Sequence, residues 1–116
     1  MKRYFLALLF SCFITQGFAQ NYTNISYGLT PERELKMDIY MPKDTDKPVL
    51  VVWVHGGAWH SGSKENPPLN LLKRGYALAS IDYRLSIEAR FPAMLFDILN
   101  NASVSVKIIR FMVVEF

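Results

Sequence analysis

Five consecutive residues, His55-Gly56-Gly57-Ala58-Trp59, follow directly after the apolar run of residues 48–54. A strand that leads into consecutive glycines presents backbone N–H groups at its tip, with no Cβ in front of them. Such N–H groups can stabilise the oxyanion that develops during acyl transfer, often the largest single contribution to catalysis. The residue types therefore indicate acyl-transfer chemistry in which the main chain takes a direct part.

Polar residues elsewhere in the sequence are interpreted as supports for this motif. Asp82, Tyr83 and Arg84 come at the end of a second predicted strand, where α/β folds collect functional groups. Arg84 is expected to form an ion pair with Asp97, an interpretation preferred over contact with a substrate.

The remaining candidates for side-chain chemistry are weak. Ser61 and Ser63 flank a glycine but do not lie in a G-x-S-x-G sequence, so they are interpreted as loop hydroxyls that bind the backbone. The chain has two histidines, His55 and His60, and no cluster of carboxylates. These residues predict no metal site and no cofactor.

The strands that must position the motif can be recognised from their patterns. Residues 49–54 are continuously apolar, which suits a strand buried on both faces of a parallel sheet, and residues 76–83 form the next such strand. Residues 35–40 alternate between apolar and polar side chains, typical of a half-buried strand. A short strand at 24–27 is expected to complete an antiparallel hairpin with it.

Two helices are expected after the motif. Asn66 is predicted to cap a helix that accommodates Pro67-Pro68 in its first turn and ends at Gly75. A second helix is predicted after residue 92, with apolar residues at every fourth position and others beside them: Met94, Ile98, Ala102 and Val106, flanked by Leu95, Leu99 and Ile109. This order of strands and helices predicts an α/β domain with a parallel sheet.

Residues 1–19 are expected to be a cleaved signal peptide rather than part of the fold. Lys2-Arg3 precede an apolar stretch, and Gly17-Phe18-Ala19 places small residues where signal peptidase cleaves. This predicts a secreted or periplasmic protein whose domain spans residues 20–116. An uncleaved membrane anchor and lipidation at Cys12 are the alternatives. Removing residues 1–19 takes away two of the 13 basic residues and none of the ten acidic ones, which lowers the net charge from +3 to +1. A charge this small gives no indication of nucleic-acid binding.

Four sequence blocks, at residues 35–42, 51–59, 80–85 and 91–93, resemble the N-terminal part of an α/β-hydrolase. They are most similar to the esterase/lipase branch with an H-G-G-x-W oxyanion loop, which includes secreted carboxylesterases. The resemblance implies an antiparallel hairpin followed by parallel strands with flanking helices. It also implies that Gly57 and Ala58 donate N–H groups to the oxyanion, that Gly56 and Trp59 adjoin the substrate, and that His55 shapes the loop. For Trp59, a plain hydrophobic plug is an equal alternative.

The same resemblance requires a catalytic triad that this sequence does not contain. No G-x-S-x-G sequence occurs, and no histidine follows His60. The apolar residues 111–116 also replace the polar loop that the resemblance implies, which indicates an incomplete domain. We therefore expect part of a serine carboxylic-ester hydrolase that is inactive alone. A non-catalytic module of this fold and a serine peptidase of the same fold are the alternatives.

The expected partners follow from this interpretation. A small-molecule ester or an ester attached to a polysaccharide is the expected substrate, with no nucleic acid and no stable membrane anchor. In the implied sheet, residues 49–54 form an apolar strand without its neighbour on one side. Such an exposed edge predicts aggregation or pairing with another chain.

Overall fold

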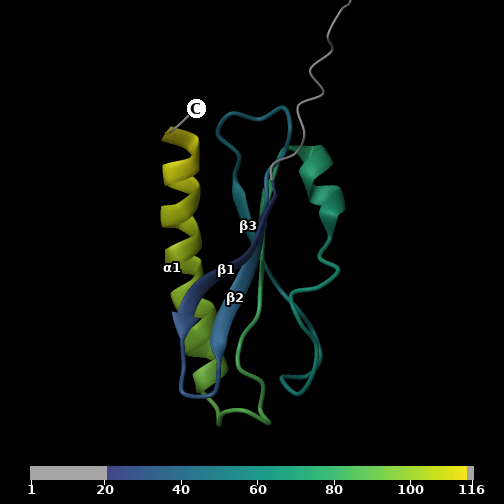
Figure 1. Ribbon diagram of the computed structural model, residues 1–116. Helices are drawn as coiled ribbons and strands as arrows, with labels where there is room; N and C mark the ends of the chain where they lie inside the picture. The colour runs from purple at the N-terminus through teal and green to yellow at the C-terminus, as the bar shows by residue number, and fades with distance from the viewer. Residues whose placement is uncertain (1–20, 115–116) are drawn as a thin grey trace, which may run out of the picture.

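The computed structural model describes residues 21–114 and forms a four-stranded mixed sheet with one long helix against it (Figure 1). The expected signal peptide, residues 1–19, and Cys12 lie outside the described residues. In chain order the elements are β1 (Asn21–Leu29), β2 (Glu34–Tyr40), β3 (Leu50–Val54), the 3₁₀ helix η1 (Leu69–Arg74), β4 (Ala77–Ile81) and α1 (Ala93–Val114). No helix among residues 21–114 is both long enough and apolar enough to span a membrane.

The strands lie in the order β1-β2-β4-β3, and this arrangement confirms the predicted fold class. β1 and β2 form the expected antiparallel hairpin, β2 pairs antiparallel with β4, and β3 pairs parallel with β4. The parallel register places Val54 beside Ile81, so both strands end at the same edge of the sheet. The loops after β3 and β4 therefore emerge side by side.

The core lies between the sheet and α1. Ala77, Ala79 and Ile81 of β4 are fully buried, as are Met37 and Ile39 of β2. α1 covers this face of the sheet, while η1 lies on the opposite face, against β4 (Figure 1). Residues two apart on β4 share a face, so Leu78 and Ser80 point toward the η1 side, where both are fully buried.

Two details of the predicted helices are wrong. Asn66 has a positive φ of 56° and caps no helix; η1 begins after Pro68 and is a short 3₁₀ helix. The Leu71 N–H donates to the carbonyl of Pro68, three residues earlier, over 3.2 Å, and only the six residues of η1 lie between Pro68 and Gly75, a length typical of 3₁₀ helices. Gly75 ends the helix as predicted, because it takes the left-handed conformation at φ 84°.

The buried face of α1 is more polar than predicted. Met94 is buried, but Leu95 and Leu99 are exposed to 37% and 67%. Asp97, Asn101 and Ser105 occupy the buried positions instead, each one turn after the last. Their polar atoms find partners: Ser105 Oγ lies 2.9 Å from Asn101 Oδ1, and Asn101 Nδ2 lies 3.2 Å from the Met37 sulfur.

Candidate functional site

The loop after β3 forms a tight turn with an unusual backbone. The N–H groups of His60 and Ser61 both donate to the carbonyl of Gly57, over 3.0 and 3.1 Å. Ala58 and Trp59, the central residues of the turn, have φ values of 52° and 63°. Positive φ at both central positions is the mark of a type I′ turn. Such a conformation strains residues with a Cβ, and strain of this kind clusters at functional sites.

Gly57 is required by this turn, whereas Gly56 is not. Gly57 has a φ of 122°, and a Cβ there would overlap the carbonyl group of Ser61. A Cβ at Gly56 would meet no protein atom within 4 Å. Within residues 21–114, the N–H groups of Gly57 and Ala58 donate to no other group. Both residues are exposed.

His55 is buried and held by Tyr83, at 5% and 1% exposure. The two rings stack with centroids 4.3 Å apart, and the Tyr83 hydroxyl donates to the His55 carbonyl over 2.8 Å. His55 Nδ1 lies 2.8 Å from the Gly56 carbonyl, which can only accept, so Nδ1 carries the proton. The stacking and this local hydrogen bond give His55 a loop-shaping position.

Trp59 is 44% exposed and meets the Tyr83 ring edge-on, with the centroids 5.5 Å apart. The carbonyl of Trp59 accepts from the N–H of Ser86 over 2.7 Å, which joins the loop after β3 to the loop after β4. The indole therefore lies partly on the surface, beside the turn. The neighbouring His60 is exposed.

Lys64 closes the loop and was not identified from the sequence. It is 7% exposed, and its Nζ lies 2.8 Å from Asp38 Oδ2 on β2. Burial opposes the charge of Lys64 most strongly, but the hydrogen bond and attraction of Asp38, with a further contribution from Glu65, raise its pKa overall. The lysine is therefore charged in the fold.

Asp82 connects this loop to the hairpin. Its Oδ1 accepts from the N–H of Lys64 over 2.8 Å, and its carbonyl accepts from the hydroxyl of Tyr27. Arg33 reaches the same region, donating to the Tyr83 carbonyl over 2.7 Å. Burial, with the charges of Asp97 and Asp82, raises the pKa of Tyr27, which keeps its hydroxyl protonated as a donor.

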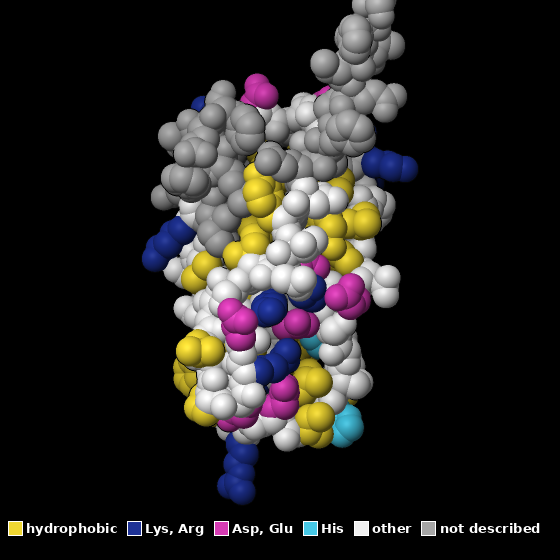
Figure 2. Space-filling view, in the orientation of Figure 1, with side chains coloured by type: hydrophobic (Ala, Val, Ile, Leu, Met, Phe, Trp, Pro, Cys, Tyr) yellow, Lys and Arg dark blue, Asp and Glu magenta, His cyan; other side chains and the backbone are white. Residues whose placement is uncertain are grey.

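The predicted ion pair between Arg84 and Asp97 is confirmed. Arg84 Nε and Nη2 reach the two carboxylate oxygens of Asp97 over 2.9 and 2.8 Å, and the Arg84 N–H adds a third bond. The bonds to Asp97 raise the pKa of Arg84 above its ordinary value. This pair joins the loop after β4 to α1. Figure 2 shows Lys and Arg side chains next to Asp and Glu side chains on one face of the molecule.

The two serines near the turn bind backbone, as the sequence indicated. Ser61 Oγ lies 3.4 Å from the Gly57 carbonyl, and Ser63 Oγ accepts from the N–H of Glu65 over 3.2 Å. Neither hydroxyl forms a hydrogen bond with the ring of His55 or His60 among the described residues. These contacts fit loop hydroxyls better than nucleophiles.

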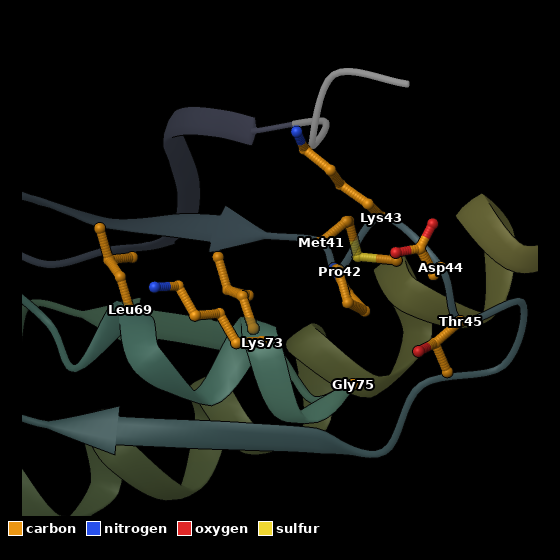
Figure 3. A pocket seen from close by; sticks show the side chains of 9 residues that line it. Met41, Pro42, Lys43, Asp44, Thr45, Leu69, Lys73 and Gly75 are labelled. Carbon is orange, nitrogen blue, oxygen red and sulfur yellow. The ribbon is translucent and has the colours of Figure 1, made fainter. Parts of the chain in front are cut away.

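A pocket of about 340 Å³ lies away from the turn, between residues 41–45 and η1 (Figure 3). β2 ends beside it at Tyr40, which pairs with Leu78 near the start of β4. The pocket therefore adjoins the opposite end of the sheet from the loop after β3. In Figure 3 the nitrogen atoms of its two lysines, Lys43 and Lys73, lie well apart and do not converge on a common point. The candidate site remains the turn at the carboxyl ends of β3 and β4.

Comparison with known proteins gives consistent results. A kynurenine formamidase of Salmo salar is 32% identical over 69% of this chain and 28% of its own length. A probable isoprenylcysteine alpha-carbonyl methylesterase of Oryza sativa subsp. japonica is 39% identical over 69% of this chain and 19% of its own. The chain thus spans about a fifth to just over a quarter of these relatives.

A solved structure agrees with the sequence relatives. The crystal structure of a proposed thioesterase from Silicibacter sp. TM1040 has a TM-score of 0.65 and 30% identity, and the match covers 75% of this chain and 33% of that one. The BD-FAE family model matches residues 37–106, more than half of the sequence, including β3, the turn and β4. This chain therefore belongs to the BD-FAE family of α/β-hydrolase-type esterases.

Proposed function

We propose that this chain is the N-terminal part of a secreted serine carboxylic-ester hydrolase and supplies half of its oxyanion hole. The observation that carries the proposal is the strained turn of residues 57–60: Gly57 and Ala58 are exposed, and among the described residues their N–H groups donate to no acceptor. An oxyanion hole needs donors that are fixed before the reaction begins. Membership of an esterase family supports this use of the turn.

In the proposed reaction, a serine from the remainder of the domain attacks the ester carbonyl carbon while a histidine base accepts its proton. The carbonyl oxygen becomes an oxyanion and receives hydrogen bonds from Gly57 and Ala58. The alcohol then leaves with the proton from the histidine, and water releases the acid from the serine. A further N–H comes from the residue after the serine.

The other residues of the turn have separate roles in this proposal. Gly56 leaves open space toward the substrate, because a Cβ there would face no protein atom. The exposed Trp59 ring provides an apolar contact for the acyl or alcohol group. Stacked on Tyr83, His55 supports the turn and is not the proton acceptor. Asp82 and Arg84 hold the second loop in place.

The proposed substrate is a small ester or an ester on a polysaccharide. The relatives are named for cleavage of a formamide, a methyl ester and a thioester, and all of these reactions pass charge to an acyl oxygen. Two of the three are esterases, which favours an ester for this chain. The N-terminal residues support export through a signal peptide cleaved after Ala19.

The alternative is a non-catalytic module with this fold, and a serine peptidase of the same fold is a further alternative. The reading frames that follow the codon for Phe116 distinguish them. A frame with G-x-S-x-G, then an acidic residue and a histidine, supports the hydrolase. Absence of such a frame supports the non-catalytic module.

The chemistry is then tested with the joined protein, which is this chain continued by the product of that downstream frame. It should hydrolyse p-nitrophenyl acetate and form a stable adduct with an alkyl phosphonate, while this chain alone should do neither. Cleavage of a peptide p-nitroanilide at a higher kcat/KM than that of the acetate ester would support the peptidase. A joined, folded protein that hydrolyses none of these substrates would refute the proposed function.

A further inference from the structure

The turn is an exposed segment held between two buried residues. Residues 56–63 are all exposed, whereas His55 and Lys64 at the two ends are 5% and 7% exposed. An exposed loop of this length ordinarily moves, and its strained residues would relax if it did. Within the segment, the Trp59 carbonyl accepts from the Ser86 N–H over 2.7 Å, and the other supports of the turn lie at its two ends.

The N-terminal end is held by ring packing and close fit. His55 stacks on Tyr83, and its carbonyl accepts from the Tyr83 hydroxyl. Gly62 fits against the His55 ring, since a Cβ at Gly62 would overlap His55 Nδ1 and the Gly56 carbonyl. These contacts fix the position of His55, and of the residues after the turn they involve only Gly62.

The C-terminal end is held by three polar contacts of Lys64 with β2, β4 and the residue after β4, besides a longer one of 3.4 Å from its Nζ to the neighbouring, exposed Glu65. The Lys64 N–H donates to Asp82 Oδ1 over 2.8 Å, and its carbonyl accepts from the Ser80 hydroxyl. Its Nζ donates to Asp38 Oδ2 over 2.8 Å. Two of the three partners, Asp38 and Ser80, are themselves buried. They lie directly opposite each other on β2 and β4, so Lys64 is fastened to the centre of the sheet.

Asp38 is a fixed partner rather than a flexible surface carboxylate. Its second oxygen accepts from the N–H of Asn24 on β1 over 2.8 Å. Asn24 has a φ of 55°, and the register between β1 and β2 shifts between Tyr22 and Ile25. This irregularity in β1 turns the Asn24 N–H toward Asp38. The lysine thus links the loop after β3 to β4, β2 and β1.

From these contacts we infer that Lys64 is a positioning residue for the oxyanion loop, and that its ion pair with Asp38 keeps the Gly57 and Ala58 N–H groups in place. This inference rests on the proposed function for its catalytic meaning. Lys64 does not touch the reacting atoms; it acts through the eight residues that separate it from His55. In the joined enzyme its loss should lower kcat about tenfold or more with little change in KM, because the loop amides bind the transition state more strongly than the substrate.

The direct test is hydrogen exchange by mass spectrometry on the full chain at low micromolar concentration. The amides of His60 and Ser61 report turn closure, because both donate to Gly57, and the Ser86 amide reports the contact with Trp59. In Lys64→Met these three amides should exchange at least tenfold faster, while β4 amides keep their protection. Lys36→Met is the matched control, since the Lys36 side chain is 41% exposed and forms an ion pair only with exposed Glu34 among the described residues.

A second variant covers the case in which Lys64→Met unfolds the chain. Ser80→Ala removes the hydroxyl that binds the Lys64 carbonyl and leaves no unpaired charge. Faster exchange confined to the His60, Ser61 and Ser86 amides supports the inference. Unchanged exchange of those amides in both variants, or in Ser80→Ala when Lys64→Met unfolds, overturns it. The exchange result does not depend on activity, so an inactive joined enzyme would refute the proposed function alone.

Discussion

A methyl group added at Gly57 should open the turn after β3, whereas the same methyl group at Gly56 should be tolerated. Gly57 has a φ of 122°, and its Cβ would overlap the carbonyl of Ser61, the residue whose N–H helps to close the turn. At Gly56 the Cβ would face open space. Gly57→Ala and Gly56→Ala therefore form a matched pair of variants, one residue apart.

The magnitude follows from two routes open to Gly57→Ala. If the backbone stays in place, alanine at this φ brings strain of about 1–3 kcal/mol in addition to the overlap. If the turn opens, the hydrogen bonds from His60 and Ser61 are lost, at about 0.5–1.5 kcal/mol each. The chain takes the less costly route, so we expect a loss of about 2 kcal/mol. Gly56→Ala should change stability by less than about 0.5 kcal/mol or raise it slightly.

Urea unfolding followed by far-ultraviolet circular dichroism, at low micromolar protein concentration, measures the difference. A loss of about 2 kcal/mol corresponds to roughly a 30-fold change in the unfolding equilibrium constant, well above the error of the method. Free energies of unfolding for the two variants that agree within about 0.5 kcal/mol would show that Gly57 is not needed for the turn.

Three further predictions concern the edge, the ion pair and pH. Residues 20–116 expressed alone should associate through β3, which pairs only with β4 among the described strands, and Val54→Lys should reduce this association; a monodisperse, cooperatively melting monomer in sedimentation would contradict it. Arg84→Met should cost about 3 kcal/mol in urea unfolding, because it leaves buried Asp97 without its cation, and Arg84→Lys should recover part of that; wild-type stability in Arg84→Met would show that the pair is not needed. The free energy of unfolding should fall above about pH 10, because burial raises the pKa of Tyr27 and the unfolded chain therefore releases that proton first. Lys64, whose pKa is also raised, acts in the same direction. A free energy of unfolding that stays constant to pH 11 in the wild type, or an equal fall in Tyr27→Phe, would contradict this assignment.

The strands of this fold could be predicted because their patterns are local. The apolar run before His55 and the alternation at residues 35–40 each give a strand within one residue of its observed bounds. β1 was underestimated, since polar residues such as Asn21 and Thr23 gain their strand conformation from pairing with β2. α1 begins where Phe91-Pro92 indicated, but which of its sides is buried depends on Met37 and the other residues it meets.

The supports of the candidate site could be predicted only in part. Arg84 and Asp97 are 13 residues apart, at the end of a strand and in the following helix, so an ion pair was a reasonable expectation. Lys64 and Asp38 are 26 residues apart and gave no local signal, because a lysine in a polar loop ordinarily points into water. The one hint is the position of Asp38 on β2, between two apolar residues that face α1, because a carboxylate on the other face of that strand needs a partner if it is buried. The strain at Ala58 and Trp59 was equally invisible, since neither residue type favours positive φ.

The most direct test of the central claim removes one N–H from the turn. In the joined enzyme, lactic acid in place of the alanine at position 58 keeps the methyl group but replaces the amide with an ester, so the donor is lost. We predict that kcat for p-nitrophenyl acetate falls roughly 10²–10³-fold with little change in KM, as expected for one oxyanion donor. An unchanged kcat would show that the Ala58 N–H does not bind the oxyanion.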